Sequence, residues 1–178
     1  MHGPEIRQDW LNPGRAVTYE ALMRRVPLSI ALAAAALFAS PAMGEGREVP
    51  YWASLRAGEV NMRVGPSEAY PITWVYRRAA LPVKVVRINQ GWRLIQDPDG
   101  TRGWVVARLL KPQQTAIVVG KDMAEIRADA DDNAKVLWRA EPGVVGIAGK
   151  CSAGWCRLAV GDRKGWIREE RVWGAGDP

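Results

Sequence analysis

An internal repeat constrains the fold of this chain more than any other feature of its sequence. Four landmarks recur in one order: an arginine, an apolar segment, a Gly-Trp pair and a second Gly-Trp pair. Arg63 lies 29 residues before Trp92, and Arg127 lies 28 residues before Trp155. The second Gly-Trp pair follows after 12 residues in one copy and after 11 in the other. Spacings that agree within one residue indicate two copies of one structural unit.

The residues of each copy predict short β-strands separated by turns. Residues 82–88 are rich in β-branched side chains, and residues 89–91 supply a tight turn after them. Residues 97–100 read Asp-Pro-Asp-Gly, a turn with proline second and glycine fourth. Residues 51–173 show no sustained helical period, so we expect an all-β chain. About five strands in some sixty residues fit a small, strongly bent barrel better than a sandwich.

Three motifs of the first copy resemble one known family. The stretches NMRVGPS (61–67), GWRLI (91–95) and DGTRGWV (99–105) are similar to the motifs of bacterial SH3 domains, the SH3b family. The second copy keeps an Ile-Arg-Ala and both Gly-Trp pairs, but it has DADDNA (129–134) in place of Gly-Pro-Ser.

This resemblance implies two tandem, small SH3-like β-barrels, over residues 51–112 and 115–174. It is specific for the fold and much less so for the ligand. Many modules of the wider family bind cell-wall peptides or target wall hydrolases, and tandem pairs resemble exported proteins of Gram-negative bacteria.

The residues before the repeat resemble an export signal. A basic start at 23–25 precedes an apolar run at 26–39 and small residues at 40–46. The run is shorter than the ~20 residues that span a bilayer. A buried helix is the alternative, but the basic–apolar–small order favours a cleaved signal peptide over residues 23–44, after an upstream extension at 1–22. We therefore expect a periplasmic or secreted protein with no membrane span after cleavage.

The positive charge of the chain lies in its first copy. The formal net charge is +6 and the pI is near 9.7. Residues 45–113 carry 11 basic and 6 acidic groups, a net of +5, whereas residues 114–178 carry 10 of each. An acidic partner would therefore meet the first copy. Small barrels with aromatic residues can bind nucleic acid, but an exported chain rarely meets it, so we expect no nucleic-acid partner.

One segment combines aromatic and basic side chains. Residues 67–78 correspond to the long loop that borders the binding face in the resembled fold. Aromatic faces beside guanidiniums suit an extended anionic peptide, although a solvated basic edge would have the same composition. Trp138 and Arg139 are all that the second copy offers there, so we expect its groove to be weaker. The candidate ligand-binding residues are Tyr70, Trp74, Tyr76, Arg77, Arg78 and Trp104.

The tryptophans of the Gly-Trp pairs have two possible roles, stacking on a ligand or packing in the core. A tryptophan can remove ~150–250 Å² from water, and a domain this small buries only ~60% of its unfolded surface. We therefore favour packing for Trp92 and Trp155. For Trp104 and Trp166, close to the closing hairpin, both roles stay open.

The residue types do not favour catalysis. The single histidine, His2, precedes the signal, which removes His-based nucleophiles and metal sites from the exported chain. Asp97 and Asp99 occupy a turn, where aspartate is expected for backbone reasons. The acidic stretch 129–133 lacks the glycine and glutamate of a calcium-binding EF-hand loop. We expect no enzyme activity, no metal and no cofactor.

The two cysteines, Cys151 and Cys156, could form a redox pair, half of a metal site or a structural disulfide. A redox C-x-x-C motif has two intervening residues, whereas four intervene here. A zinc site would need two further ligands that the exported chain lacks. The pair spans the hairpin at which the first copy has Arg93 opposite Ile88 or Asn89. Residues across a hairpin lie ~4.5–5.5 Å apart, so we predict a disulfide. An exported chain reaches an oxidising compartment, in which disulfides persist.

Three functions follow from these expectations. The first is a non-catalytic binding or targeting protein for a cell-wall peptide, such as the stem peptides of peptidoglycan. The second is an adaptor that docks another exported protein. The third, which the missing catalytic groups disfavour, is a cell-wall hydrolase.

Overall fold

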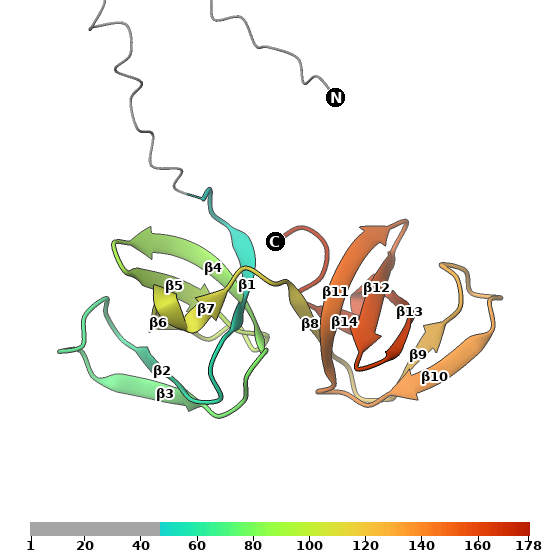
Figure 1. Cartoon of the computed structure of the whole chain (residues 1–178), viewed down its shortest axis with the longest axis horizontal. Helices are drawn as coiled ribbons and strands as arrows, with labels where there is room; N and C mark the ends of the chain where they lie inside the picture. Colours follow the sequence, from blue (N-terminus) through green and yellow to red (C-terminus); the bar gives the residue numbers. More distant parts are fainter. Residues whose placement is uncertain (1–46) are drawn as a thin grey trace, which may run out of the picture. The chain divides into compact units, whose positions relative to one another are not determined.

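The computed structural model describes residues 47–178 of the chain, which contain 14 β-strands and two short 3-10 helices (Figure 1). The strands form two seven-stranded sheets, so the predicted all-β fold of two tandem barrels is confirmed. The predicted extension (1–22) and signal peptide (23–44) lie outside the described residues. Within residues 47–178, no helix is long and apolar enough to cross a membrane.

The first barrel contains β1 to β7 and the 3-10 helix η2. Its elements are β1 (Tyr51–Leu55), β2 (Val60–Arg63), β3 (Ile72–Tyr76), β4 (Pro82–Asn89), β5 (Trp92–Gln96), β6 (Arg102–Val106), η2 (Ala107–Leu109) and β7 (Leu110–Lys111).

The second barrel repeats this order of elements. They are β8 (Thr115–Val118), β9 (Ala124–Arg127), β10 (Val136–Ala140), β11 (Val145–Ser152), β12 (Trp155–Val160), β13 (Arg163–Arg168), η3 (Glu169–Arg171) and β14 (Val172–Trp173).

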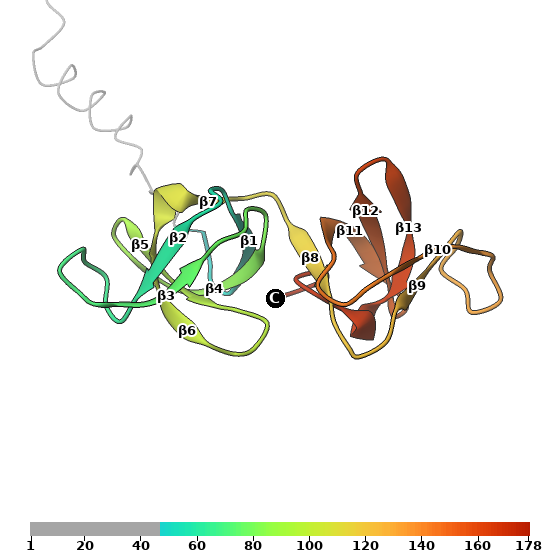
Figure 2. The same cartoon turned by 90° about the horizontal axis from the view of Figure 1, so that it is seen from below.

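The two sheets have the same topology. The strand order is β3-β2-β6-β5-β4-β1-β7 in the first sheet and β10-β9-β13-β12-β11-β8-β14 in the second. Every pairing is antiparallel. In each barrel one hairpin, β2–β3 or β9–β10, extends away from the rest of its sheet and ends in a long loop (Figures 1 and 2). The sequence repeat is therefore a repeat of topology.

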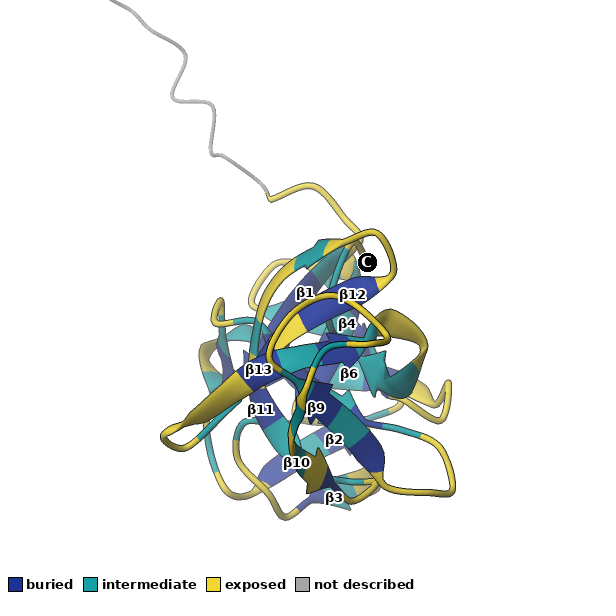
Figure 3. Ribbon diagram, turned by 90° about the vertical axis from the view of Figure 1, so that its right-hand side faces the viewer, coloured by how far each residue is buried: buried dark blue, intermediate teal, exposed yellow. Residues whose placement is uncertain are grey.

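Each barrel has its own apolar core, made where alternate side chains of its strands turn inward. Buried residues follow the strands, and exposed residues concentrate in the loops and hairpin ends (Figure 3). Fully buried residues of the first core include Leu55, Val85 and Ile95, and those of the second include Ile126 and Ile167. Trp155 is buried and Trp92 is half-buried, as their predicted packing role requires.

The glycine of the closing Gly-Trp pair lets β6 and β13 cross close to a neighbouring strand. A Cβ atom on Gly165 would lie 2.5 Å from Ile126 Cγ2 and 2.7 Å from the Arg127 carbonyl oxygen. A Cβ atom on Gly103 would meet the side chain of Met62 in the same way. A real side chain at either position would push β2 or β9 away from the sheet that it closes.

We predict that Gly165→Ala destabilises the protein by about 1–3 kcal/mol, because the added methyl group overpacks against backbone that cannot move aside. Urea unfolding followed by circular dichroism measures the change. Gly58→Ala is the control, because a Cβ atom there meets nothing within 4 Å. Equal free energies of unfolding for the two variants would contradict the role of Gly165 in barrel closure.

The two cysteines form a disulfide across the β11–β12 hairpin, as predicted. Cys151 lies directly opposite Cys156 in the strand register, with Cα atoms 4.0 Å apart. The corresponding pair in the first barrel is Ile88 opposite Arg93, which settles the alternative between Ile88 and Asn89. The disulfide joins the two strands of the hairpin just before the turn at Ala153.

We predict that replacing Cys151 and Cys156 together by serine lowers the free energy of unfolding by about 2 kcal/mol, the chain-entropy value for so short a loop. Thermal unfolding in oxidising buffer measures the loss. Reduction of the native protein should reproduce it and have no effect on the double variant. Two reactive thiols in the oxidised native protein would contradict the disulfide.

The two barrels contact each other within the compact unit Gly46–Pro178. The rings of Trp52 and Trp173 meet edge to face with centroids 4.7 Å apart. The indole N–H of Trp52 donates to the carbonyl oxygen of Gly176 at 3.0 Å, and the Thr115 hydroxyl donates to the carbonyl oxygen of Ala80 at 2.8 Å. These contacts give the tryptophans at the start of the first copy and the end of the second a structural role.

Candidate functional site

The arginine that marks each repeat holds the long loop of its own barrel. Arg63 Nη1 donates to the carbonyl oxygen of Tyr70 at 2.7 Å, and Arg127 Nη1 donates to that of Ala134 at 2.7 Å. The donor and acceptor are seven residues apart in both barrels. Because the loops differ in sequence but not in this contact, the shared arginine positions the loop in space.

Three of the predicted site residues lie on the surface of the first barrel. Tyr70 and Trp74 are 46% and 57% exposed, on the long loop and on the edge strand β3. Arg77 is also exposed and pairs with Glu59 at 2.8 Å. These residues provide aromatic and cationic groups on one hairpin, but they line none of the hollows described below.

Tyr76 belongs to the core, which corrects its assignment to the ligand-binding face. Only 7% of it is exposed, and its hydroxyl donates to Asp97 Oδ2 at 3.1 Å. Burial, and then the negative charge of Asp97, raise the pKa of the Tyr76 phenol well above its ordinary value. Asp97 also accepts from the backbone N–H groups of Asp99 and Thr101. The carboxylate is a turn residue with its acceptors occupied.

The last two predicted residues lie apart from this surface group. Arg78 donates from Nη1 to the carbonyl oxygen of Gly143 in the second barrel at 2.8 Å. Trp104 is half-buried on β6, opposite Leu94 on one side and Arg63 on the other. The structure thus keeps Tyr70, Trp74 and Arg77 as a surface group and gives the other three contacts within the fold.

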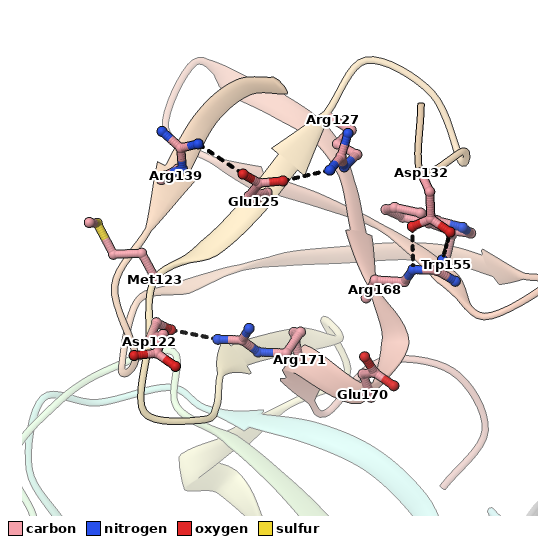
Figure 4. Close-up of a pocket in the computed structure, with 10 residues that line it drawn as sticks. All are labelled: Asp122, Met123, Glu125, Arg127, Asp132, Arg139, Trp155, Arg168, Glu170 and Arg171. Carbon is pink, nitrogen blue, oxygen red and sulfur yellow. Dashed lines mark hydrogen bonds and ion pairs between the residues drawn. The ribbon is translucent and has the colours of Figure 1, made fainter. Parts of the chain in front are cut away.

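A charged groove of about 550 Å³ lies in the second barrel (Figure 4). The sequence predicts the weaker site for this barrel. That prediction uses the composition of one loop, which does not show the side chains that β9, β10, β13 and η3 bring together. Four acidic and four basic side chains surround the groove, together with one sulfur-containing and one aromatic side chain. They are Asp122, Glu125, Asp132, Glu170, Arg127, Arg139, Arg168, Arg171, Met123 and Trp155.

Ion pairs order the side chains of the groove. Glu125 accepts from Arg127 at 2.6 Å and from Arg139 at 2.9 Å (Figure 4). Arg168 pairs with Asp132 of the long loop. Each pair leaves further donors and acceptors available, because a guanidinium has five N–H groups and a carboxylate about four lone-pair sites. The groove therefore presents fixed charges of both signs.

Trp155 provides an apolar surface next to these charges. Only 4% of the residue is exposed, and the guanidinium of Arg168 lies 4.3 Å from the centroid of its ring. Stacking and the ion pair with Asp132 together fix the position of Arg168. Trp155, which the sequence predicts to pack in the core, thus also supports a charged side chain of the groove.

The first barrel keeps the arginine of the groove, as Arg63, but has uncharged residues at three of the other charged positions. The strand registers place Asn61 where the second barrel has Glu125, and Val75 where it has Arg139. Val106 takes the place of Arg168. Alternation along β9, with Glu125 and Arg127 two residues apart, is the one sequence signal that could have indicated the groove.

A separate cluster of side chains in the second barrel has the composition of a metal site. The sulfur atoms of Cys151 and Cys156 lie within 4.8 Å of a carboxylate oxygen of Glu169. The sulfur atoms are joined in the disulfide, and a metal binds a thiolate. The three residues do not fit a metal ion in this state.

Comparison with protein families identifies the fold. The model of the bacterial SH3 domain matches residues 56–112 and 120–174, one match for each barrel. The chain belongs to the bacterial SH3 domain family. The resemblance that the Gly-Trp motifs carry is therefore confirmed, including its tandem arrangement.

No curated protein matches the chain. Solved structures with some likeness include NlpC1 and NlpC2 from Trichomonas vaginalis and an NlpC/P60 family protein from Bacillus cereus. Each is 13% identical to the chain; the matches cover 71%, 70% and 69% of it, with TM-scores of 0.33, 0.33 and 0.31. They cover 46%, 48% and 56% of those proteins, so the chain spans about half their length. A likeness at this level carries no argument about function.

The hydrogen bond from Arg139 lowers the pKa of Glu125 below its ordinary value of 4.5, with a further contribution from the charge of Arg127. We predict that Arg139→Gln raises the pKa of Glu125 toward 4.5. A carboxyl group with a lowered pKa stabilises the fold above pH 4.5 and loses that contribution as the pH falls through its folded pKa.

Carbon-detected NMR titration of the Glu125 carboxyl group measures this change. Lys164→Gln is the matched control, because it removes one positive charge from an exposed residue that does not line the groove. An unchanged Glu125 pKa in Arg139→Gln would contradict the ion pair.

Proposed function

We propose that this chain is a non-catalytic, exported binding protein that contacts a cell-wall peptide through its bacterial SH3 domains. Membership of that family supports a cell-wall or protein partner. The disulfide between Cys151 and Cys156 supports an extracytoplasmic location, because disulfides form and persist in oxidising compartments. The predicted signal peptide is consistent with this location.

The single observation that carries the proposal is the charged groove of the second barrel. Its ordered carboxylates and guanidiniums can pair with both the ammonium and the carboxylate groups of a peptide. The stem peptides of peptidoglycan are ligands of this class. The long loop, held by Arg127 and bearing Asp132, forms one wall of the groove and leaves space for an extended chain.

Two other functions remain as alternatives. An adaptor would use the same surfaces to dock an exported protein, and the exposed Tyr70 and Trp74 of the first barrel favour that reading. A wall hydrolase would need a nucleophile activated by a base. The carboxylates of Glu125, Asp132 and Asp97 accept hydrogen bonds in ion pairs or turns, and this favours binding over catalysis.

We predict that the protein co-sediments with purified sacculi at low salt. Arg139→Gln should weaken this binding roughly five- to tenfold, since it removes the charge-assisted hydrogen bond from the guanidinium to a carboxylate of the peptide. Salt should weaken the binding further by screening the exposed charges. Quantitative sedimentation at several salt concentrations measures both effects.

Lys164→Gln again serves as the control, with the same change in net charge outside the groove. If both variants lost binding equally, net charge and not the groove would hold the protein on the wall. If the native protein were not retained at low salt, the proposed ligand would be wrong. A protein crosslinked to the chain after digestion of the wall would then support the adaptor.

A further inference from the structure

A second hollow of about 490 Å³ lies beside the charged groove, on the other side of Met123 and Arg139. About half of its lining is apolar, whereas most of the side chains around the groove are charged. Trp138, Ala140, Val144 and Val160 contribute apolar surface, and the charged Glu141, Asp162 and Arg163 also line it. Met123 and Arg139 line both hollows, so the two are neighbouring parts of one surface.

At the hollow the second barrel has small side chains where the first barrel has a larger, hydrogen-bonded pair. The strand registers place Ala140 where the first barrel has Tyr76, opposite Ala124 and Val60 respectively. Val160, which pairs with Arg163 at the end of its ladder, takes the position of Asp97, the residue directly after Gln96 at the end of β5. In the first barrel the Tyr76 hydroxyl donates to Asp97 and both residues are buried. Two small apolar residues take the place of this pair, and both line the hollow.

The tryptophan of the hollow carries a polar atom without a partner. Trp138 Nε1 is buried and, among residues 47–178, no acceptor binds its hydrogen. A buried donor without an acceptor costs about 1–3 kcal/mol. A ligand that brings a carbonyl oxygen to this N–H, with a small movement of the ring, would remove that cost. The equivalent Trp74 of the first barrel is 57% exposed, so its indole can reach water.

We propose that this hollow binds one apolar side chain of a peptide whose charged groups lie in the adjacent groove. The apolar side chain would cover Ala140, Val144 and Val160, and the peptide carbonyl next to it would accept the hydrogen bond of Trp138 Nε1. The inference rests on the proposed function, which supplies a charged peptide as the ligand. It adds that this peptide must carry an apolar side chain beside charges of both signs.

The location of the hollow explains why such a ligand would select the second barrel. The charged groups of a peptide would bind in the groove alone. An apolar side chain would add binding free energy only in the second barrel, where the small residues Ala140 and Val160 stand at the positions of Tyr76 and Asp97. In the first barrel the strand position of Ala140 holds the buried Tyr76, and the adjacent groove positions hold Asn61 and Val75. Binding would therefore need both features, which occur together in the second barrel.

The test compares two acetylated, amidated peptides, Lys-Leu-Glu and Lys-Gly-Glu, titrated into ¹⁵N-labelled protein. The leucine peptide should bind roughly five- to tenfold more tightly, because its side chain leaves water, and it should shift the indole N–H signal of Trp138. Trp138→Phe identifies that signal by its disappearance. The glycine peptide should shift groove signals only.

The filling variant Ala140→Tyr/Val160→Asp installs the pair of the first barrel. It should abolish the preference for leucine and leave binding of the glycine peptide unchanged, with thermal unfolding confirming the fold. A preference that persists in this variant would overturn the proposal. If the variant does not fold, the native protein decides: equal affinities, or an indole signal that the leucine peptide does not move, would overturn it.

The result is separable from that of the sacculus experiment. A native protein that prefers the leucine peptide but does not bind sacculi would retain the hollow as a peptide site and refute the cell wall as its target. A protein that binds sacculi without a preference for leucine would support the groove and refute the hollow.

Discussion

The close approach of β6 to β2, and of β13 to β9, is the constraint on which the rest of each barrel depends. Gly103 and Gly165 leave no side chain between these strands, so the sheet can curl until its two halves meet. The closure also fixes Arg63 and Arg127 at the end of β2 and β9, where each holds its long loop through one carbonyl oxygen. The loop that borders the candidate site is thus positioned by the same crossing that closes the core.

The two barrels use one topology but stabilise it in different ways. The first has a buried hydrogen bond between Tyr76 and Asp97, which ties β3 to the turn before β6. The second lacks this pair and instead has the disulfide of the β11–β12 hairpin. Ala140 and Val160, at the strand positions of the missing pair, line the second hollow. The stabilising contacts of the two barrels thus differ at the positions that line the hollow.

Local features of the fold could be predicted from the sequence, because they depend on short spacings. The repeat, the turns and the Cys151–Cys156 pair are of this kind. Tyr76 could not be placed, since Trp74 has the same strand parity and is exposed while Tyr76 is buried. That difference arises where the hairpin leaves the barrel, which only the folded topology defines. The charged groove was missed for a related reason: Glu125, Arg139 and Arg168 come from three strands and meet only in the closed sheet.

Net charge would direct attention to the first barrel, since residues 45–113 carry a net charge of +5 and residues 114–178 carry none. Net charge describes long-range attraction, however, and a neutral total can conceal opposite charges held at fixed positions. In the second barrel Glu125, Arg139 and Arg168 are ordered by ion pairs and by the ring of Trp155. An ordered array of both signs favours ligands whose charges match its geometry, whereas a net positive charge attracts any anion. Under the proposed function, the basic barrel would bring the protein to an acidic surface and the neutral barrel would select the peptide.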